Sequence, residues 1–339
     1  MTTDPVPAPP DSRDQGVPWH YGDPLREQRH LIAGTALVDL SHRGVVTISG
    51  PDRLSWLHDL TTAALRDLAP GESRLALILD PNGRVEHELH VVDDGAVTWL
   101  TVEPGTAADV VAYLRSMQFM LRVEVADVTA NYAVIGTMAA IAVMGEVAAW
   151  SAPAEFAGSG VTPAGEDRGG DASKYVPARP AVFPAVEHIV GRGDLAAALA
   201  AAPHLAGTWA WEALRVAAGV PRLGADTDSR SLPHELGWIG PAVHLAKGCY
   251  RGQEAVARTH NMGRPPRRLV LLHLDGSAEQ LPVHGAPVEV AGRQVGWVGT
   301  AVQHHEWGPI ALAVVKNRTD PTVPVLAGGV DATQEPIVV

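Results

Sequence analysis

The sequence predicts an α+β protein that ends in a small β-barrel. Before residue 150, apolar residues alternate with polar ones in some segments and recur at helical spacing in others, so strands and helices are mixed. After Arg268 only strand-like segments remain, and glycines separate them. The Pro265–Pro266 pair ahead of them holds an extended link, because each proline fixes its own φ and restricts the residue before it. We therefore expect a domain boundary at this pair and a small terminal barrel after it.

The expected elements follow from apolar spacing and turn residues. A strand over Val45–Ser49 leads through Gly50 and Pro51 into a helix that begins after Asp52. The tight turn Asp80–Gly83 joins two further strands, over 75–79 and 85–92. The remaining expected elements are a strand over 97–102, a helix after Thr106, a strand over 121–125, helices over 194–202 and 208–218, and barrel strands over 269–274, 287–290, 294–302 and 310–315.

Two segments are predicted to be irregular. Residues 1–18 carry Asp4, Asp11 and Asp14 among repeated prolines and have no apolar stretch, which predicts a disordered tail and argues against a secretory signal. Residues 151–181 lose all periodicity, which predicts a mobile loop. The predicted division is a tail (1–18), an N-terminal α+β domain that binds the ligand (19–150), a flexible insertion (151–182), a second α+β part (183–264) and the barrel (265–330).

Composition and charge exclude several classes of protein. The 339 residues are 46% hydrophobic and 19% charged, as in ordinary globular proteins. The longest apolar stretch, Ala139–Trp150, is too short for a membrane helix and contains Glu146, so we expect a cytoplasmic protein without membrane contact. A net charge of −12 disfavours general nucleic-acid binding. The single cysteine, Cys249, excludes an internal disulfide, a four-thiolate zinc site and an iron-sulfur cluster held by this chain alone.

The segment around Cys249 is the strongest candidate for chemistry. Cys249 stands between Gly248 and Tyr250, two residues after Lys247, and a helix-like stretch begins near Glu254. A nearby cation and a helix N-terminus both lower the pKa of a thiol and so favour the reactive thiolate. The alternative is a small buried thiol that packs as a hydrophobic residue, although the flanking glycines argue against a core position.

Positive charge is concentrated in the same region. Between residues 247 and 268 the cations outnumber the acids by five, which suggests a site for a carboxylate- or phosphate-bearing ligand. The alternative is a solvated face whose cations pair with acids elsewhere. The charged residues of this segment are Lys247, Arg251, Arg258, Arg264, Arg267, Arg268 and the one acid Glu254.

The 15 histidines raise two further possibilities. His244, Cys249 and His260 have no zinc-binding spacing, so no stably bound metal is expected. A Cys249–His pair with His234 or His260 as the base would be a cysteine hydrolase, since such partners need only be neighbours in space.

The motif Lys247-Gly-Cys-Tyr-x-Gly-Gln-Glu254, followed by Val256-Ala-Arg258, resembles the signature of the YgfZ-type folate-binding proteins. This family is related to the T-protein of the glycine cleavage system, a tetrahydrofolate-dependent aminomethyltransferase. The supporting segments are Leu214-Arg215 through Gly219-Val-Pro221, Pro233-His-Glu235 and Gly50-Pro-Asp-Arg-Leu-x-Trp-Leu57, so that the resemblance extends over residues 45–316.

The resemblance implies a T-protein-like fold, in which two intertwined α+β domains surround a central folate cavity and a small barrel follows. It also implies a tetrahydrofolate-binding accessory protein, without classical turnover, that assembles or repairs iron-sulfur enzymes. The implied partners are the folate and the iron-sulfur client or assembly proteins. The implied site residues are Cys249 and Lys247 for the chemistry, Arg251, Arg258, Arg215 and Glu88 for folate, and Gly248, Tyr250, Gly252, Gln253 and Glu254 as the frame of the motif.

Two departures from the T-protein pattern affect these expectations. T-proteins hold the pterin with a glutamate in a Leu-Arg-Leu-Glu-Ala-Gly helix, and Ala217 stands in its place here. The T-protein aspartate pair is replaced by Glu86-His87-Glu88, which leaves Glu88 as a candidate acceptor. A folate-dependent aminomethyl- or methyltransferase is therefore the alternative function.

Overall fold

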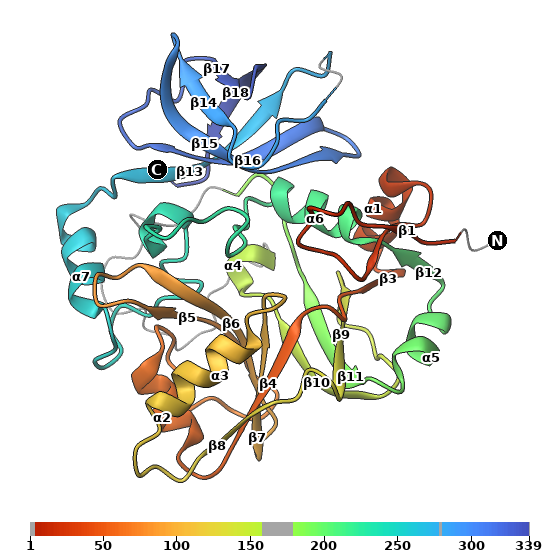
Figure 1. The fold of residues 1–339 in the computed structure, drawn as a ribbon, viewed down its shortest axis with the longest axis vertical. Coiled ribbons are helices and arrows are strands. Elements are labelled where there is room, and N and C mark those ends of the chain that lie inside the picture. The colour runs from red at the N-terminus through yellow and green to blue at the C-terminus, as the bar shows by residue number, and fades with distance from the viewer. Residues whose placement is uncertain (1–3, 158–178, 278–279, 339) are drawn as a thin grey trace.

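Two five-stranded sheets and a closed six-stranded barrel build the protein (Figure 1). The computed structural model describes residues 4–157, 179–277 and 280–338. Among these residues, no helix has both the length and the apolar character needed to cross a bilayer.

The first sheet has the strand order β5-β6-β7-β4-β8. Helices α2 (Arg53–Leu60) and α3 (Ala107–Ser116) cover one face and bury a core that includes Leu57, Leu100 and Leu114. Period-two alternation sends every second side chain of a strand into this core. The strands of the first sheet are β4 (Gly44–Ser49), β5 (Ser73–Leu79), β6 (Val85–Asp93), β7 (Val97–Val102) and β8 (Glu124–Asp127).

The second sheet has the strand order β10-β11-β9-β3-β12. In the chain, all strands of the first sheet lie between β3 and β9 of the second, so the two α+β units are intertwined as predicted. The predicted segments 19–150 and 183–264 both contribute strands to this sheet. Its elements are β3 (Ala36–Asp39), β9 (Tyr132–Thr137), β10 (Glu146–Ser151), β11 (Val186–Gly191), β12 (His204–Ala206), α1 (Pro24–Ile32), α4 (Ala154–Ala157), α5 (Leu195–Ala200) and α6 (Thr208–Ala217).

The C-terminal strands close into the predicted barrel, in the order β13-β16-β15-β14-β17-β18. Helix α6 packs against β15 and joins the barrel to the second sheet. A 3-10 helix (Pro233–Leu236) and α7 (Gln253–Met262) precede the barrel. The barrel strands are β13 (Arg267–Leu274), β14 (Pro287–Val290), β15 (Arg293–His304), β16 (Gly308–Lys316), β17 (Val325–Ala327) and β18 (Val330–Pro336).

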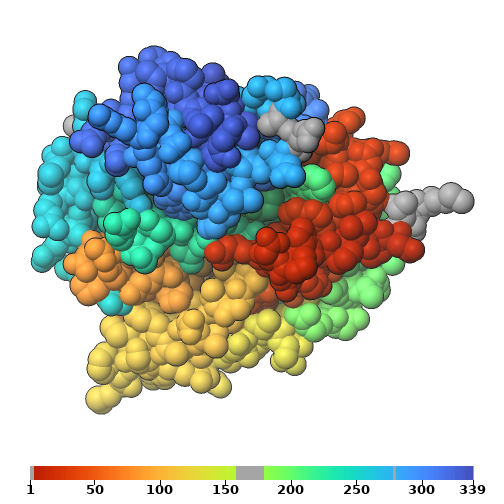
Figure 2. All heavy atoms as spheres, turned by 45° about the horizontal axis from the view of Figure 1, so that its top comes forward, coloured from red at the N-terminus to blue at the C-terminus, as the bar shows by residue number. Residues whose placement is uncertain are grey.

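The prediction of a disordered tail over residues 1–18 is wrong from residue 4 onward. Strand β1 (Val6–Pro7) pairs with β2 (Pro18–His20), and Asp14 is buried. The segment is ordered because Arg222, more than 200 residues away, supplies the charge that Asp14 needs. Figure 2 shows this red segment packed between the blue barrel and the rest of the molecule. The predicted loop contains the short helix α4, and its residues 158–178 lie outside the described part of the chain.

Candidate functional site

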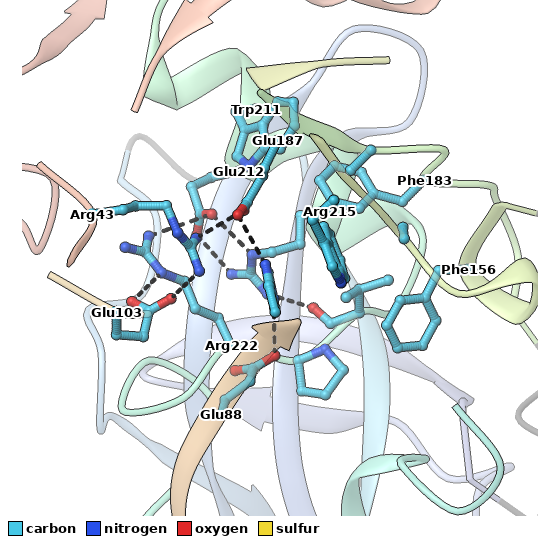
Figure 3. A pocket seen from close by; sticks show the side chains of 16 residues that line it. Arg43, Glu88, Glu103, Phe156, Phe183, Glu187, Trp211, Glu212, Arg215 and Arg222 are labelled. Carbon is cyan, nitrogen blue, oxygen red and sulfur yellow. Dashed lines mark hydrogen bonds and ion pairs between the residues drawn. The ribbon is translucent and has the colours of Figure 1, made fainter. Parts of the chain in front are cut away.

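A central cavity of about 40 Å³ lies between the two sheets, α6 and the segment that follows α6 (Figure 3). Strand β6 contributes Glu88 and His90, and β11 contributes Glu187. The full lining consists of Arg43, Glu88, His90, Glu103, Trp150, Ala152, Phe156, Phe183, Ala185, Glu187, Trp211, Glu212, Arg215, Val220, Pro221 and Arg222.

Buried ion pairs fill one side of the central cavity. Arg43 lies 3.3 Å from Glu103 and 3.4 Å from Glu187, which links the two sheets. Arg222 continues the chain of charges, at 2.9 Å from Glu103 and 2.8 Å from Asp14. Because unpaired buried charges are costly, each of these side chains depends on its partners to stay in place.

Helix α6 supplies the second half of this network. Arg215 lies on the same face as Glu212, three residues earlier, at a distance of 2.7 Å. The Arg215 guanidinium also lies 2.7 Å from Asp226 and donates to Thr300 Oγ1 of the barrel at 2.9 Å. Arg215, predicted as a folate ligand, therefore lines the cavity but is already bound on several sides.

His90 and Glu187 form an ion pair in the central cavity, and each shifts the pKa of the other. Burial by itself would raise the pKa of Glu187, but the charges of Arg43 and His90 outweigh it and lower the pKa to about 2. Burial opposes protonation of His90, yet Glu187, at 3.0 Å, raises the pKa of His90 above its usual value. The His90 ring also stacks on Trp150, with centroids 3.8 Å apart. The contact with Glu187 and the stacking on Trp150 together fix the orientation of the His90 ring.

The opposite wall of the central cavity is aromatic, and its chemistry suits a flat heteroaromatic ring. Trp150, Phe156, Phe183 and Trp211 form this wall, with carboxylates nearby to accept from ring N–H groups. The free volume of about 40 Å³ is small for such a ring, since a protein cavity known to bind one benzene has about 150 Å³. A two-ring pteridine therefore does not fit the central cavity in this conformation.

A larger outer chamber of about 490 Å³ adjoins the central cavity and shares Glu212 and Arg222 with it. Trp19 and Trp209 stack on one side of the chamber, with ring centroids 5.6 Å apart. The N-terminal segment forms another wall, and Pro282 and Thr300 of the C-terminal part form a third. The chamber has the room that the central cavity lacks.

The cysteine motif forms a separate feature on α7. Gly252 precedes the helix with φ +84, and a Cβ there would lie 2.5 Å from the carbonyl oxygen of Asp80. Gly83 of the same turn would place a Cβ 2.9 Å from the Cβ of Ala255. The predicted turn Asp80–Gly83 is therefore the surface on which α7 begins, and both glycines are required by this close approach. Gln253 closes the loop by donating to the Lys247 carbonyl at 3.5 Å.

Lys247 is buried and binds the end of α2. Its ammonium donates to the carbonyls of His58 and Thr61, at the C-terminus of that helix. A cation at this position interacts favourably with the helix dipole. Burial lowers the pKa of Lys247 to about 8, and the ammonium lies 4.9 Å from the centre of the buried Tyr250 ring.

Cys249 is exposed, as is Gly248 beside it, so the sulfur is not a packed core atom. Cys249 does not line the central cavity, and neither do Arg251 and Arg258. Arg251 pairs with Glu86 at 3.0 Å on the surface, while Arg258 is exposed. The structure thus separates the cysteine motif from the central cavity, although the resemblance implies folate contacts from Arg251 and Arg258.

Glu88 and Ala217, the two positions where the chain departs from the T-protein pattern, lie in different pockets. Glu88 lines the central cavity, 7% exposed, and accepts from the Leu223 N–H at 3.1 Å. Ala217 instead lines another pocket, of about 210 Å³, together with Trp307 and His304 of the barrel. Among the described residues, no group of three or more His, Cys, Asp or Glu side chains is arranged to hold a metal ion.

Comparison with known proteins shows which proteins have a similar sequence and fold. The family model of the GCVT N-terminal domain matches residues 16–138. These residues are therefore similar to a GCVT N-terminal domain. The fold is shared with the glycine cleavage system aminomethyltransferase T of Bartonella henselae, at a TM-score of 0.69 and 20% identity, over 93% of this chain and 89% of that one.

Three curated relatives with different names match this chain at the same identity of 27%. The tRNA-modifying protein YgfZ of Klebsiella pneumoniae is 27% identical, over 84% of this chain and 86% of its own length. A mitochondrial homologue of the iron-sulfur cluster assembly factor IBA57 from Mycosarcoma maydis is 27% identical, over 73% and 60%. A chloroplastic protein of Arabidopsis thaliana is 27% identical over 78% of this chain, which spans 61% of that relative. The predicted resemblance to YgfZ-type proteins and to the T-protein is confirmed.

Sequence reasoning missed most of the ion network around the GCVT domain. Glu103 directly follows β7, and Glu187 lies inside β11, where charged residues interrupt apolar strands. Glu212 and Arg215 are three residues apart on α6. Charged residues at inward-facing strand and helix positions were the available signal. Local sequence patterns do not predict which of these charges pair, because partners such as Glu103 and Arg222 are 119 residues apart.

Proposed function

We propose that this protein is a tetrahydrofolate-binding accessory factor that assembles or repairs iron-sulfur enzymes, with Cys249 acting on the partner protein. The exposed position of Cys249 on an anchored loop is the observation that carries this proposal. Lys247 fixes one side of the loop to α2, and Gly252 fixes the other side to the turn at Asp80. A thiol on such a loop is accessible to another protein without entering a cavity.

The comparisons support the iron-sulfur part of the proposal. One relative is named as an iron-sulfur cluster assembly factor homologue, and its match extends over most of this chain. A single thiolate does not hold a cluster, but it can complete the ligands of a partner or accept a sulfur-containing group. The proposed partners are therefore the client or assembly proteins that carry the cluster.

The folate part of the proposal rests on the chamber next to the GCVT domain. The outer chamber offers a stacked tryptophan pair for a ring and the guanidinium of Arg13 for a carboxylate. A folate in this chamber reaches the central cavity only if Glu212 and Arg222 move. The folate-binding roles of Arg251 and Arg258 remain predictions, at positions away from this chamber.

A complementation experiment tests the role of the cysteine. We expect cells that lack the protein and carry Cys249→Ser to lose the activity of iron-sulfur enzymes, as the deletion does. Asn261→Ala, an exposed change on α7, the helix that follows the cysteine loop, is the matched control and should restore wild-type activity. Full rescue by Cys249→Ser would overturn the proposed role of the thiol.

Calorimetric titration with a reduced folate tests the ligand in parallel. We expect Trp209→Ala to weaken binding, because it removes half of the stacked pair, and Arg251→Ala combined with Arg258→Ala to have the smaller effect. A larger loss of affinity in the double arginine variant than in Trp209→Ala would place the folate site at the cysteine motif instead. If the wild type binds no folate, the folate part of the proposal is wrong, while the proposed role of Cys249 is unaffected.

The alternative function is a folate-dependent aminomethyl- or methyltransferase. It is favoured by one observation, the Glu88 carboxylate in the central cavity at the place of a T-protein aspartate. This function predicts turnover of a small amine donor in the presence of folate and loss of turnover in Glu88→Gln. It predicts no dependence on Cys249, so the two functions give opposite results with Cys249→Ser.

A further inference from the structure

A pocket of about 370 Å³ lies between the end of α7 and the barrel, away from both the cavity and the cysteine. Figure 1 shows the link that leads from α7 to β13. The lining of the pocket is Arg264, Pro265 and Pro266 from the link, and Lys316, Asn317 and Arg318 from the end of β16. We call this the junction pocket.

The two sides of the junction pocket are held together by hydrogen bonds. The backbone N–H of Asn317 donates to the Pro266 carbonyl at 3.0 Å, and its side-chain amide donates to the Pro265 carbonyl at 2.8 Å. The two prolines restrict the backbone of the link as well. The pocket is therefore formed in advance, and a ligand does not have to order it.

Three cations line the junction pocket and no acid does. Arg264, Lys316 and Arg318 are exposed, and none of them makes an ion pair within the described residues. The Lys316 ammonium donates to the Gln294 carbonyl at 3.1 Å. The carboxylate of Asp320, two residues beyond Arg318, accepts from the N–H and the hydroxyl of Thr322. Among the described residues, no carboxylate therefore lies within ion-pair distance of these three cations.

A fourth cation lies behind the pocket. Arg268 is 7% exposed, and its guanidinium donates to the carbonyls of Asn317 and Thr319 at 3.2 and 2.6 Å. In the described part of the chain it has no carboxylate within ion-pair distance, and its Nε has no hydrogen-bond partner. Burial lowers the pKa of Arg268, with Asp320 opposing the shift. An anion in front of the turn would compensate this buried charge.

The basic segment noted in the sequence divides in the structure. Arg251 pairs with Glu86, and Arg267 pairs with Asp228 and Glu235, as the solvated-face alternative expects. Lys247 is instead buried and binds backbone carbonyls at the end of α2. Arg264 and Arg268 instead join Lys316 and Arg318, which are distant in the sequence. Part of the positive charge of this segment therefore lies beside the barrel, at the end of β16.

We propose that the junction pocket is a binding site for a small phosphate-bearing anion of the pyrophosphate type. Converging cations require a ligand with several negative charges, and guanidinium groups match phosphate oxygens with paired hydrogen bonds. The net charge of −12 opposes a long polyanion lying across the surface, so the ligand is a compact one. The site is independent of the proposed folate and cysteine functions.

Isothermal titration with sodium pyrophosphate tests this site. We expect saturable one-to-one binding to the wild-type chain that weakens as sodium chloride is added. Arg264→Ala combined with Arg318→Ala should weaken binding by roughly tenfold or more, because two hydrogen bonds to a charged ligand are lost. The matched control, Arg26→Ala combined with Arg29→Ala, removes two exposed cations from α1 and should leave the affinity unchanged.

Two results would overturn the proposal. One is the absence of saturable binding to the wild type, and the other is an equal loss of affinity in both double variants, which would indicate non-specific attraction. Thermal unfolding of each variant shows that it is folded, and all four substituted side chains lie outside the buried core. Failure of this experiment leaves the proposed function untouched, since neither Cys249 nor the outer chamber is altered.

Discussion

Lys247 shows how one residue fits two explanations until its partners are known. In the sequence it stands two positions before Cys249 and suggests a cation that activates the thiol. In the structure its ammonium binds the carbonyls at the end of α2. Spacing along the chain gives no direction for a long, flexible side chain, so this part of the site was not predictable from the motif.

Substitution of Lys247 by methionine separates the two explanations. We expect Lys247→Met to lower the free energy of unfolding by about 1 kcal/mol, because hydrogen bonds to a charged donor are lost while a buried charge is removed. We also expect the rate at which Cys249 reacts with iodoacetamide to keep its pH profile. Urea unfolding and alkylation rates measure the two effects. A profile displaced clearly to higher pH would show that Lys247 activates the thiol.

Cys249 was the more predictable residue. Its flanking glycines argued against a core position, and the structure places it on the surface. Its distance from the cavity was not predictable, since no sequence pattern shows that α7 begins against the turn Asp80–Gly83. The ion network was missed for the same reason, because its partners meet only after both sheets have formed.

Helix α7 depends on glycine at the point where it begins. Gly252 has φ +84, and a Cβ added there would meet the Asp80 carbonyl. Gly71 has φ +85, and a Cβ added there would have no atom within 4 Å. The two glycines therefore share the same backbone conformation and differ in their surroundings. The difference in stability between variants at Gly252 and Gly71 therefore measures the effect of the close contact between α7 and the turn Asp80–Gly83.

Replacement of each of these glycines by alanine gives a matched pair. We expect Gly71→Ala to cost about 1–2 kcal/mol, the penalty of a left-handed conformation for an L-residue. Gly252→Ala should cost more than this, because its Cβ also displaces the Asp80 carbonyl. Urea unfolding measures both variants. Equal losses would mean that the docking of α7 on the turn is loose.

At the scale of elements, local patterns predicted more than long-range partners did. The strands on either side of the turn Asp80–Gly83, the helix after Asp52 and the first four barrel strands appear where apolar spacing placed them. The last two barrel strands, β17 and β18, were not predicted. The N-terminal segment was misjudged because its order comes from outside the segment. Asp14 has its partners in His42 and Arg222, and proline-rich sequence without those partners would be disordered.

For the whole molecule, the buried ion network is the point where the separate parts meet. Asp14 comes from the N-terminal segment, Arg43 and Glu103 flank the first sheet, Glu187 belongs to the second, and Arg215 reaches the barrel through Thr300. Replacing such a network by apolar residues is often harmless, but removing one member leaves a buried charge unpaired. We infer that the network sets how the two sheets and the barrel are oriented, and that protonating it loosens all three together.

The pH dependence of unfolding follows from this network. The charges of Arg43 and His90 outweigh burial and lower the pKa of Glu187 to about 2, and those of Arg222 and Arg43 likewise lower the pKa of Glu103. A carboxyl with a lowered pKa in the folded state contributes stability above its unfolded pKa and loses it as the pH falls through the folded value. We therefore expect the free energy of unfolding to decrease from about pH 4.5 to pH 2, by about 3 kcal/mol from Glu187 alone.

Urea unfolding at a series of pH values between 7 and 3 measures this loss. Glu187→Gln is the informative comparison, because an amide does not titrate. We expect this variant to be less stable than the wild type at pH 7, where Arg43 and His90 lose their partner, and to lose less stability on acidification. Parallel curves for the two proteins would show that Glu187 is not held charged, and the network would then not be the electrostatic centre that joins the parts of the fold.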